Sequence, residues 1–204
     1  MLIGLTGQTG AGKSTVSALL LEHGFAVIDA DECSHEVTRP GKPCLIKLRE
    51  AFGEDILDEH GALNRKLLAK RAFSDADRKK TLETIIFPFI IENIEQKLAL
   101  LQAKGHRLVI LDAPTLFESG VDKLCDQVIS VMAPRKVRFQ RIMQRDAMTP
   151  EQANLRMDAQ LPEEFYRSHS RHMIENAGSR GELAKQVEEL RRLLAEVEGC
   201  QTDE

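Results

Sequence analysis

Short apolar runs alternate with stretches of helical periodicity along this chain. Four segments have the length and composition of buried strands: 1–6, 25–28, 107–112 and 127–131. A shorter run, His172–Ile174, adds a fifth candidate strand. Between the first two strands, apolar residues recur at helical spacing and predict a helix over 14–22, which ends near Gly24. Strand, helix and strand at this spacing form a βαβ unit, so we expect a parallel sheet.

The remaining helical patterns lie mainly between the second and third strands and after the fourth. Further helices are expected at 44–52, 64–73, 75–103, from Pro134 onward, 149–160, from Pro162 onward and 180–197. Asn64 and Thr149 are the expected N-caps of their helices. Pro88 interrupts the longest pattern and predicts either a kink or the start of a second helix.

The first strand ends in a phosphate-binding pattern. Gly7, Gly12, Lys13 and Ser14 fit G-x-x-x-x-G-K-[ST], in which backbone N–H groups and a helix N-terminus surround phosphate oxygens. Lys13 would reach the β- and γ-phosphates, and the Ser14 hydroxyl would hold Mg²⁺. A plain glycine-rich turn is the alternative. The Lys-Ser pair and the flanking strand and helix argue against that alternative.

Acidic residues follow two other strands. In parallel sheets, ligands bind at the carboxyl ends of the strands, so we expect Asp29, Asp31 and Asp112 at the same edge as the loop. Asp31 has two interpretations: a helix N-cap, or a base that accepts a proton from a substrate hydroxyl. The residues alone favour the cap. Asp112 resembles the second acidic motif of phosphate-loop enzymes, which helps to hold Mg²⁺.

The helix after Pro134 is rich in arginine. Arg138, Arg141 and Arg145 are spaced by three and four residues and therefore share one helix face. Such a face can be solvated, can bind nucleic acid, or can form a lid whose arginines neutralise phosphate charge. Arg65, alone near the start of its helix, is either solvated or a ligand for an anionic substrate, and the solvated interpretation is favoured.

Composition limits the classes of function. The 204 residues suit one domain, and the net charge of −4 argues against a general nucleic-acid or anionic-membrane binder. No apolar stretch reaches the length of a membrane span, and no secretion signal is apparent. Cys33, Cys44, Cys125 and Cys200 are scattered, which is typical of reduced thiols in the cytoplasm.

The loop predicts binding of a nucleoside triphosphate without naming the reaction. The guanine-recognition patterns N-K-x-D and T-K-x-D do not occur in the sequence, which argues against a GTPase switch. A small phosphate-loop domain with helical insertions and an arginine-bearing lid fits phosphoryl transfer to a small acceptor.

Several motifs together resemble dephospho-coenzyme A kinases over nearly the whole chain. They are Gly4–Gly7 with Gly10–Thr15, Asp29-Ala30-Asp31, Arg39–Pro43, Leu63-Asn64-Arg65, Pro114-Thr115-Leu116-Phe117-Glu118, Gln140-Arg141 with Arg145-Asp146, Gln160 and Ile174-Glu175-Asn176. The phosphate loop alone is common to many families, whereas this combination is far more specific. The chain departs from the family pattern at Phe87, where His is usual, at Thr9 and Thr115, and at Ser170-Arg171, which replaces an Ala-Asp pair.

The resemblance implies a fold and an activity. The fold is an α/β, three-layer P-loop NTPase of the nucleoside-monophosphate-kinase type, with a parallel five-stranded sheet, a helical substrate-binding insertion and a lid. Its expected subregions are a nucleotide-binding core (1–31, 105–134 and 170–198), a substrate-binding region (32–104) and a lid (135–169). The activity is ATP-dependent phosphorylation of the ribose 3′-hydroxyl of dephospho-coenzyme A in the cytoplasm. The alternatives are another small-molecule or nucleotide kinase, or a nucleotide-dependent regulatory protein.

The resemblance also implies roles for individual residues. Asp31 becomes the general base, and Lys13 and Arg141 stabilise charge on the transferred phosphoryl group. The expected ATP contacts are Gly10, Ala11, Gly12, Lys13, Ser14, Thr15, Arg141, Arg145 and Asn176. The expected acceptor contacts are Thr6, Asp29, Asp31, Arg65, Pro88, Leu116, Glu118 and Gln160. Ser14 is the expected Mg²⁺ ligand, with Asp112 as a second candidate. The protein is expected to be a monomer or a weak homo-oligomer, with no nucleic-acid or membrane partner.

Overall fold

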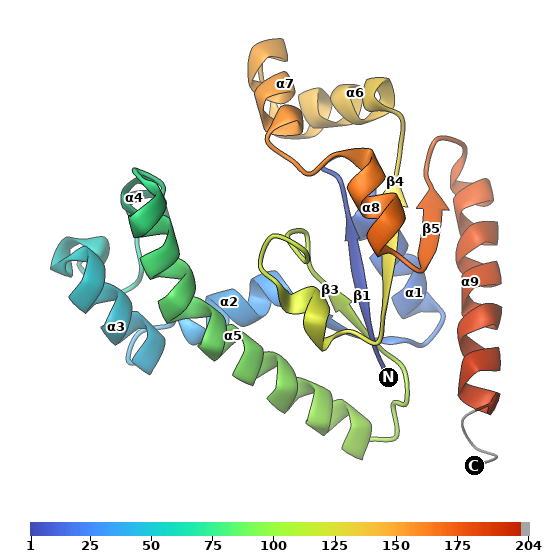
Figure 1. The fold of residues 1–204 in the computed structure, drawn as a ribbon, viewed down its shortest axis with the longest axis horizontal. Coiled ribbons are helices and arrows are strands. Elements are labelled where there is room, and N and C mark those ends of the chain that lie inside the picture. Colours follow the sequence, from blue (N-terminus) through green and yellow to red (C-terminus); the bar gives the residue numbers. More distant parts are fainter. Residues whose placement is uncertain (201–204) are drawn as a thin grey trace. The chain divides into compact units, whose positions relative to one another are not determined.

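The computed structural model describes the backbone of residues 1–200 and the side chains of residues 1–195, so Cys200 lies outside the described side chains. The chain forms two compact units, drawn in Figure 1. Unit 1 comprises Met1–Val27 and Leu101–Glu204, and unit 2 comprises Ile28–Leu100.

The predicted α/β fold with a five-stranded parallel sheet is confirmed. The strands are β1 (Leu2–Gly7), β2 (Ala26–Asp29), β3 (Val109–Asp112), β4 (Gln127–Met132) and β5 (His172–Glu175), in the order β2-β3-β1-β4-β5. β1 pairs in parallel with β3 on one side and β4 on the other, and all six of its residues are buried. A central strand buried on both faces explains its continuous apolar run.

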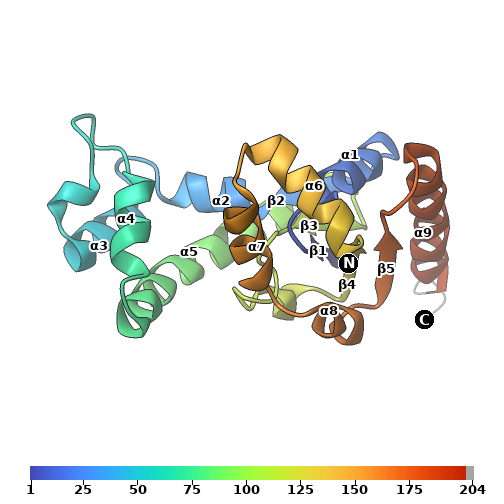
Figure 2. The same ribbon diagram turned by 90° about the horizontal axis from the view of Figure 1, so that it is seen from above.

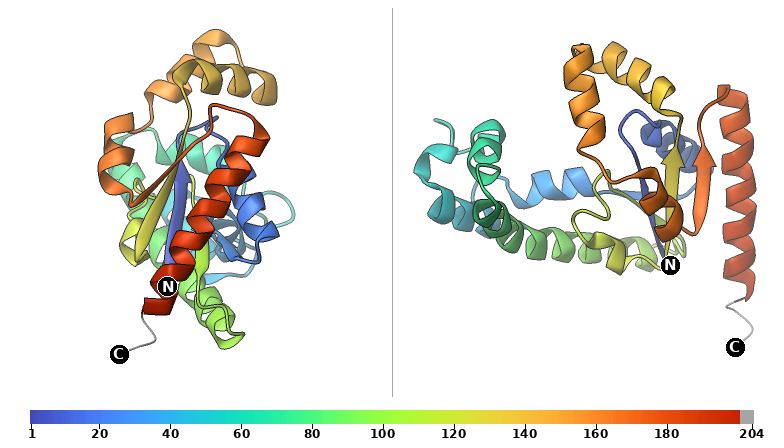
Figure 3. Two further views of the ribbon diagram at one scale, coloured as in Figure 1. Left: turned by 90° about the vertical axis from the view of Figure 1, so that its right-hand side faces the viewer. Right: turned by 45° about the horizontal axis from the view of Figure 1, so that its top comes forward.

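Helices cover both faces of the sheet in unit 1. α1 (Lys13–Glu22) and α9 (Arg180–Cys200) pack on one face, where Ile3 and Leu5 of β1 point into the main apolar core. α8 (Glu163–His169) lies on the side opposite to α1 (Figure 2), and α9 lies lengthwise against the sheet (Figure 3). On the face of α8, a Cβ at Gly4 would come within 2.7 Å of Leu116, because the segment after β3 packs directly on β1.

Two further helices follow β4. α6 (Arg135–Asp146) and α7 (Pro150–Asp158) enclose a small apolar core of Ile142, Ala153 and Met157. Thr149 is the predicted N-cap of α7, and its hydroxyl accepts a hydrogen bond from Gln152 N at 3.3 Å. A short 3₁₀ helix, η2 (Val121–Leu124), precedes β4.

Unit 2 is helical. It contains α2 (Ala30–Val37), α3 (Pro43–Phe52), the 3₁₀ helix η1 (Glu54–Ile56), α4 (Arg65–Ala72) and most of α5 (Ala76–Ala103). Asn64 caps α4 as predicted, since its side chain accepts from Leu67 N at 3.1 Å. None of the helices within residues 1–200 combines the length and apolarity needed to cross a membrane.

One of the two alternatives at Pro88 is excluded, and the expected N-cap of the helix after β2 was wrong. α5 continues through Pro88 as one helix, so a second helix does not begin there, although Pro88 has no N–H to give to the Thr84 carbonyl. The N-cap of α2 is Asp29 and not Asp31, because β2 runs into the helix without a loop. Asp29 Oδ1 accepts from Glu32 N at 3.0 Å, and Asp31 lies in the first helical turn.

Candidate active site

The phosphate loop is held in place through its carbonyl groups. Arg141 Nη1 donates to the carbonyls of Gly10 (3.3 Å) and Ala11 (3.2 Å), and Asn176 Nδ2 donates to that of Ala11 (2.8 Å). Gly10 and Gly12 have φ values of +77° and +96°, which favour glycine. The first N–H groups of α1 have no partner within the helix. The loop therefore directs carbonyls toward α6 and β5, and offers the N-terminus of α1 to an anion.

Lys13 and Asp112 form an ion pair beside this loop. Their side chains are only 17% and 11% exposed. The register of the sheet explains the pair, since Asp112 of β3 lies opposite Leu5, two residues before β1 ends. The ammonium group and the carboxylate that the sequence assigned to phosphate and metal binding are thus neighbours at one edge of the sheet.

The three aligned arginines of α6 have three different environments. Arg138 is 5% exposed, and its Nε donates to the Ala133 carbonyl at 3.0 Å. Arg141 bonds to the loop and, through Nη2, to the Asn176 carbonyl at 3.1 Å. Arg145 is mostly exposed and pairs with the adjacent Asp146 at 2.7 Å. The interpretation as a solvated basic face is therefore wrong for Arg138 and Arg141, and Arg145 is not brought to the loop.

The link between α7 and α8 also contacts the loop. Gln160 Oε1 accepts from Thr9 N at 2.7 Å, and Gln8 Nε2 donates to the Leu161 carbonyl at 3.2 Å. Gln160, expected among the acceptor contacts, thus bonds to the backbone of the phosphate loop. Through these two hydrogen bonds, the linker between α7 and α8 holds the phosphate loop next to the start of α8.

The segment after β3 carries the other unit 1 residues of the predicted acceptor set. Thr6 Oγ1 donates to the Pro114 carbonyl at 3.4 Å, Leu116 is fully buried, and Glu118 is exposed. Between the last two, the Phe117 ring packs edge-on against Phe165 of α8, with 5.2 Å between centroids. The apolar side chains fix the segment and leave the Glu118 carboxylate accessible.

Unit 2 holds the remaining predicted residues. Arg65 Nη2 donates to Thr38 Oγ1 at 2.7 Å. Burial lowers the pKa of Arg65, and the negative charge of Asp31 opposes this effect. Asp31 and Arg65 are therefore electrostatic neighbours, although they belong to different helices. Asp29 is occupied as the cap of α2, and Pro88 lies within α5.

Comparison with known proteins settles the family. The family model described as dephospho-CoA kinase matches residues 1–182. The chain belongs to the dephospho-CoA kinase family. A dephospho-CoA kinase of Anaeromyxobacter dehalogenans is 39% identical over 198 residues, which cover 97% of this chain and 92% of the relative. One of Corynebacterium glutamicum is 38% identical over 181 residues, which cover 89% and 93% of the two chains.

Solved structures agree with this family. TT1252 from Thermus thermophilus superposes with a TM-score of 0.82 at 34% identity, covering 96% of this chain and 97% of that one. The dephospho-CoA kinase from Campylobacter jejuni gives a TM-score of 0.72 at 26% identity, covering 97% and 98%. A shikimate kinase from Bacteroides thetaiotaomicron, at a TM-score of 0.52, 15% identity and coverage of 96% and 98%, shares the fold alone.

Sequence reasoning missed several residues around the site of this family member. Tyr166 of α8 is fully buried, and Thr38 binds Arg65. Arg138 was identified on the arginine face of its helix, but its burial was not predicted. Gln8 occupies a position that the loop pattern leaves unspecified. The one available signal was the unusual arginine density of α6, which could have suggested that some of these charges are used inside the protein.

Proposed function

We propose that this chain transfers the γ-phosphoryl group of ATP to the ribose 3′-hydroxyl of dephospho-coenzyme A, and gives coenzyme A and ADP. The observation that carries this function is the family match over residues 1–182, which includes the phosphate loop. The Lys13–Asp112 ion pair and the contacts of Arg141 and Asn176 to the loop support it, because positive side chains beside a phosphate loop suit a triphosphate.

The mechanism follows from the charges of these residues. Lys13 moves from Asp112 to the β- and γ-phosphates, and Arg141 adds positive charge next to the loop. Both stabilise negative charge on the transferring group. Asp31 orients the acceptor hydroxyl and takes its proton, while Arg65 beside it contacts the acceptor. Asn176 keeps the loop in its binding conformation.

Magnesium is part of the proposal. The Ser14 hydroxyl and the Asp112 carboxylate are hard oxygen donors, of the kind that Mg²⁺ prefers when phosphates and water complete its coordination. Bound Mg²⁺ would neutralise charge on the phosphates. The subregions given above, the cytoplasmic location and the state as a monomer or weak homo-oligomer stay predictions.

The test is an acceptor panel with ATP. We expect ADP release with dephospho-coenzyme A and none above background with nucleosides, nucleotides or sugars. Turnover of one of those other acceptors alone would favour the second kinase class. ATP binding without turnover of any acceptor would favour a regulatory protein.

The role of Asp31 has its own test. Asp31→Asn should lower kcat by at least about a hundredfold, the usual contribution of a general base, and leave ATP affinity nearly unchanged. Asp77→Asn removes an equal charge from an exposed position in the same unit and serves as the matched control. Near-normal turnover of Asp31→Asn would remove Asp31 from the role of base.

A further inference from the structure

Two buried polar side chains of unit 1, Arg138 and Tyr166, lie close enough to interact electrostatically. Tyr166 of α8 is fully buried, and Arg138 of α6 is 5% exposed. Among the described residues, neither the Tyr166 hydroxyl nor Arg138 Nη1 has a hydrogen-bond partner. Folded proteins rarely leave buried polar atoms unpaired, so the polar groups nearest to each of these atoms are its candidate partners.

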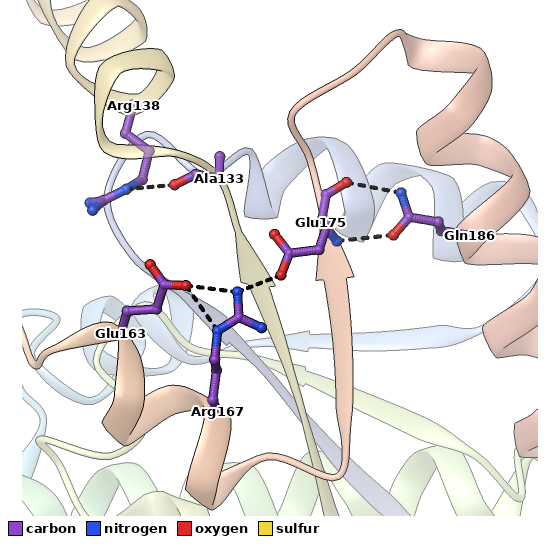
Figure 4. A network of polar contacts seen from close by, with 6 residues as sticks. All are labelled: Ala133, Arg138, Glu163, Arg167, Glu175 and Gln186. Carbon is purple, nitrogen blue, oxygen red and sulfur yellow. Dashed lines mark hydrogen bonds and ion pairs between the residues drawn. The ribbon is translucent and has the colours of Figure 1, made fainter.

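These side chains belong to well-anchored elements. Figure 4 shows Arg138 bound to the Ala133 carbonyl at the end of β4. It also shows α8 tied to β5, since Arg167 bridges Glu163 and Glu175 with contacts of 2.7 Å to each. The Tyr166 hydroxyl and Arg138 Nη1 therefore belong to helices, α8 and α6, that are hydrogen bonded to the neighbouring strands or their ends.

Glu118 is the neighbour that can accept a hydrogen bond from the Tyr166 hydroxyl. The ring of Phe117 packs edge-on against Tyr166, with 5.7 Å between centroids, so the next residue, Glu118, is held beside α8. Burial raises the pKa of Tyr166 to about 12, the charge of the Glu118 carboxylate and its interaction with the hydroxyl add to this rise, and the Arg138 charge acts in the opposite direction. The hydroxyl thus stays protonated at neutral pH and can donate to a carboxylate.

We propose that Tyr166 is a positioning residue for the acceptor: its hydroxyl donates to the Glu118 carboxylate in the substrate complex and directs that carboxylate toward a hydroxyl group of dephospho-coenzyme A. Arg138, behind Tyr166, balances the negative charge brought into this region. The inference rests on the proposed function, since it concerns how the same acceptor is held. Under this proposal, Tyr166 and Arg138 act in acceptor binding and not in binding the phosphates of ATP.

The test uses Tyr166→Phe in the full chain. The hydroxyl makes no well-formed hydrogen bond in the free protein and interacts only weakly with Glu118, so the melting temperature should change little. Loss of one charge-assisted hydrogen bond should raise KM for dephospho-coenzyme A about tenfold and leave KM for ATP unchanged. Ser130→Ala is the matched control. It removes another fully buried hydroxyl, bonded to Ser170 at 2.7 Å, and should lower the melting temperature while both KM values stay unchanged.

A double-mutant cycle with Glu118→Gln identifies the partner. If Tyr166 acts through Glu118, adding Tyr166→Phe to Glu118→Gln should raise the acceptor KM little further. An unchanged acceptor KM in Tyr166→Phe, an equal rise in both KM values, or fully additive effects would each overturn the inference and leave the proposed function intact. Failure of the unaltered chain to phosphorylate dephospho-coenzyme A would overturn both.

Discussion

At the scale of the residue, Gly12 shows how tightly the phosphate loop is packed. Its φ is +96°, and a Cβ there would lie 2.1 Å from Nδ2 of Asn176. That amide donates to the Ala11 carbonyl. Any side chain at position 12 must therefore displace the group that holds the loop.

Comparison of two alanine variants isolates this contact. Gly24 has a similar φ, +86°, but a Cβ there would meet nothing within 4 Å. Gly24→Ala should reduce the free energy of unfolding by about 1–2 kcal/mol, the penalty of the left-handed conformation, with ATP affinity unchanged. Gly12→Ala adds the collision and should weaken ATP binding more than about tenfold. Denaturant unfolding and calorimetric titration with ATP measure the two effects, and equal ATP affinities would contradict the packing argument.

Residues in local motifs were predictable, and residues oriented by tertiary packing were not. Lys13 and Ser14 follow from an eight-residue pattern, and Asp112 follows from its place at a strand end. By contrast, Asn176 reaches the Ala11 carbonyl across 165 positions of sequence. The shared helix face of Arg138 and Arg141 was readable from their spacing, but their burial depends on where α6 packs.

At the scale of the element, the edge strand β5 depends on a titratable contact. His172 of β5 and Gln127 of β4 are hydrogen bonded through Nε2 and Oε1 at 2.8 Å. Burial and, after it, the positive charge of Arg171 lower the pKa of His172. The folded protein therefore favours the neutral ring. Its Nε2–H can donate to Oε1, the side-chain amide oxygen of Gln127.

This contact predicts a loss of stability in mild acid. The pKa of His172 is lower in the folded state than the value of about 6.5 in the unfolded chain. Its stabilising contribution is thus complete above that pH and decreases as pH falls toward the folded pKa, because the unfolded chain binds the proton more readily. Between pH 7.5 and 5.5, His172→Gln should lose less unfolding free energy than the unaltered protein. His60→Gln, at an exposed position, is the control and should follow the unaltered protein. Parallel losses in all three would contradict the role of His172.

Element types were more predictable than their junctions. The sheet and the main helices follow from apolar periodicity, but Pro88 marked no helix boundary, because α5 continues through it. The junction of β2 and α2 lacks a loop, and the cap therefore moved from Asp31 to Asp29. With the cap at Asp29, Asp31 lies in the first turn of α2, where its charge acts on Arg65.

At the scale of the whole molecule, the predicted ligands divide between the two units. All the predicted ATP contacts, from Gly10 to Asn176, belong to unit 1. The predicted acceptor contacts belong to both, with Asp31 and Arg65 in unit 2 and Glu118 in unit 1. The family model covers residues 1–182, and this range includes both predicted sets.

Hydrogen exchange can test whether ATP binds to unit 1 alone and whether the acceptor also contacts unit 2. A ligand slows amide exchange where it stabilises the closed local structure. A non-hydrolysable ATP analogue alone should slow exchange in 7–15 and at the end of β5, and leave 30–38 and 64–68 unchanged. Dephospho-coenzyme A should slow exchange in those two unit 2 segments. In Lys13→Met, protection by the ATP analogue should disappear and protection by dephospho-coenzyme A should persist. The reason is that Lys13 is proposed to contact only the phosphates of ATP. Protection of 30–38 by the ATP analogue alone would contradict the assignment of Asp31 to the acceptor, since ATP would then contact or order the helix that carries it.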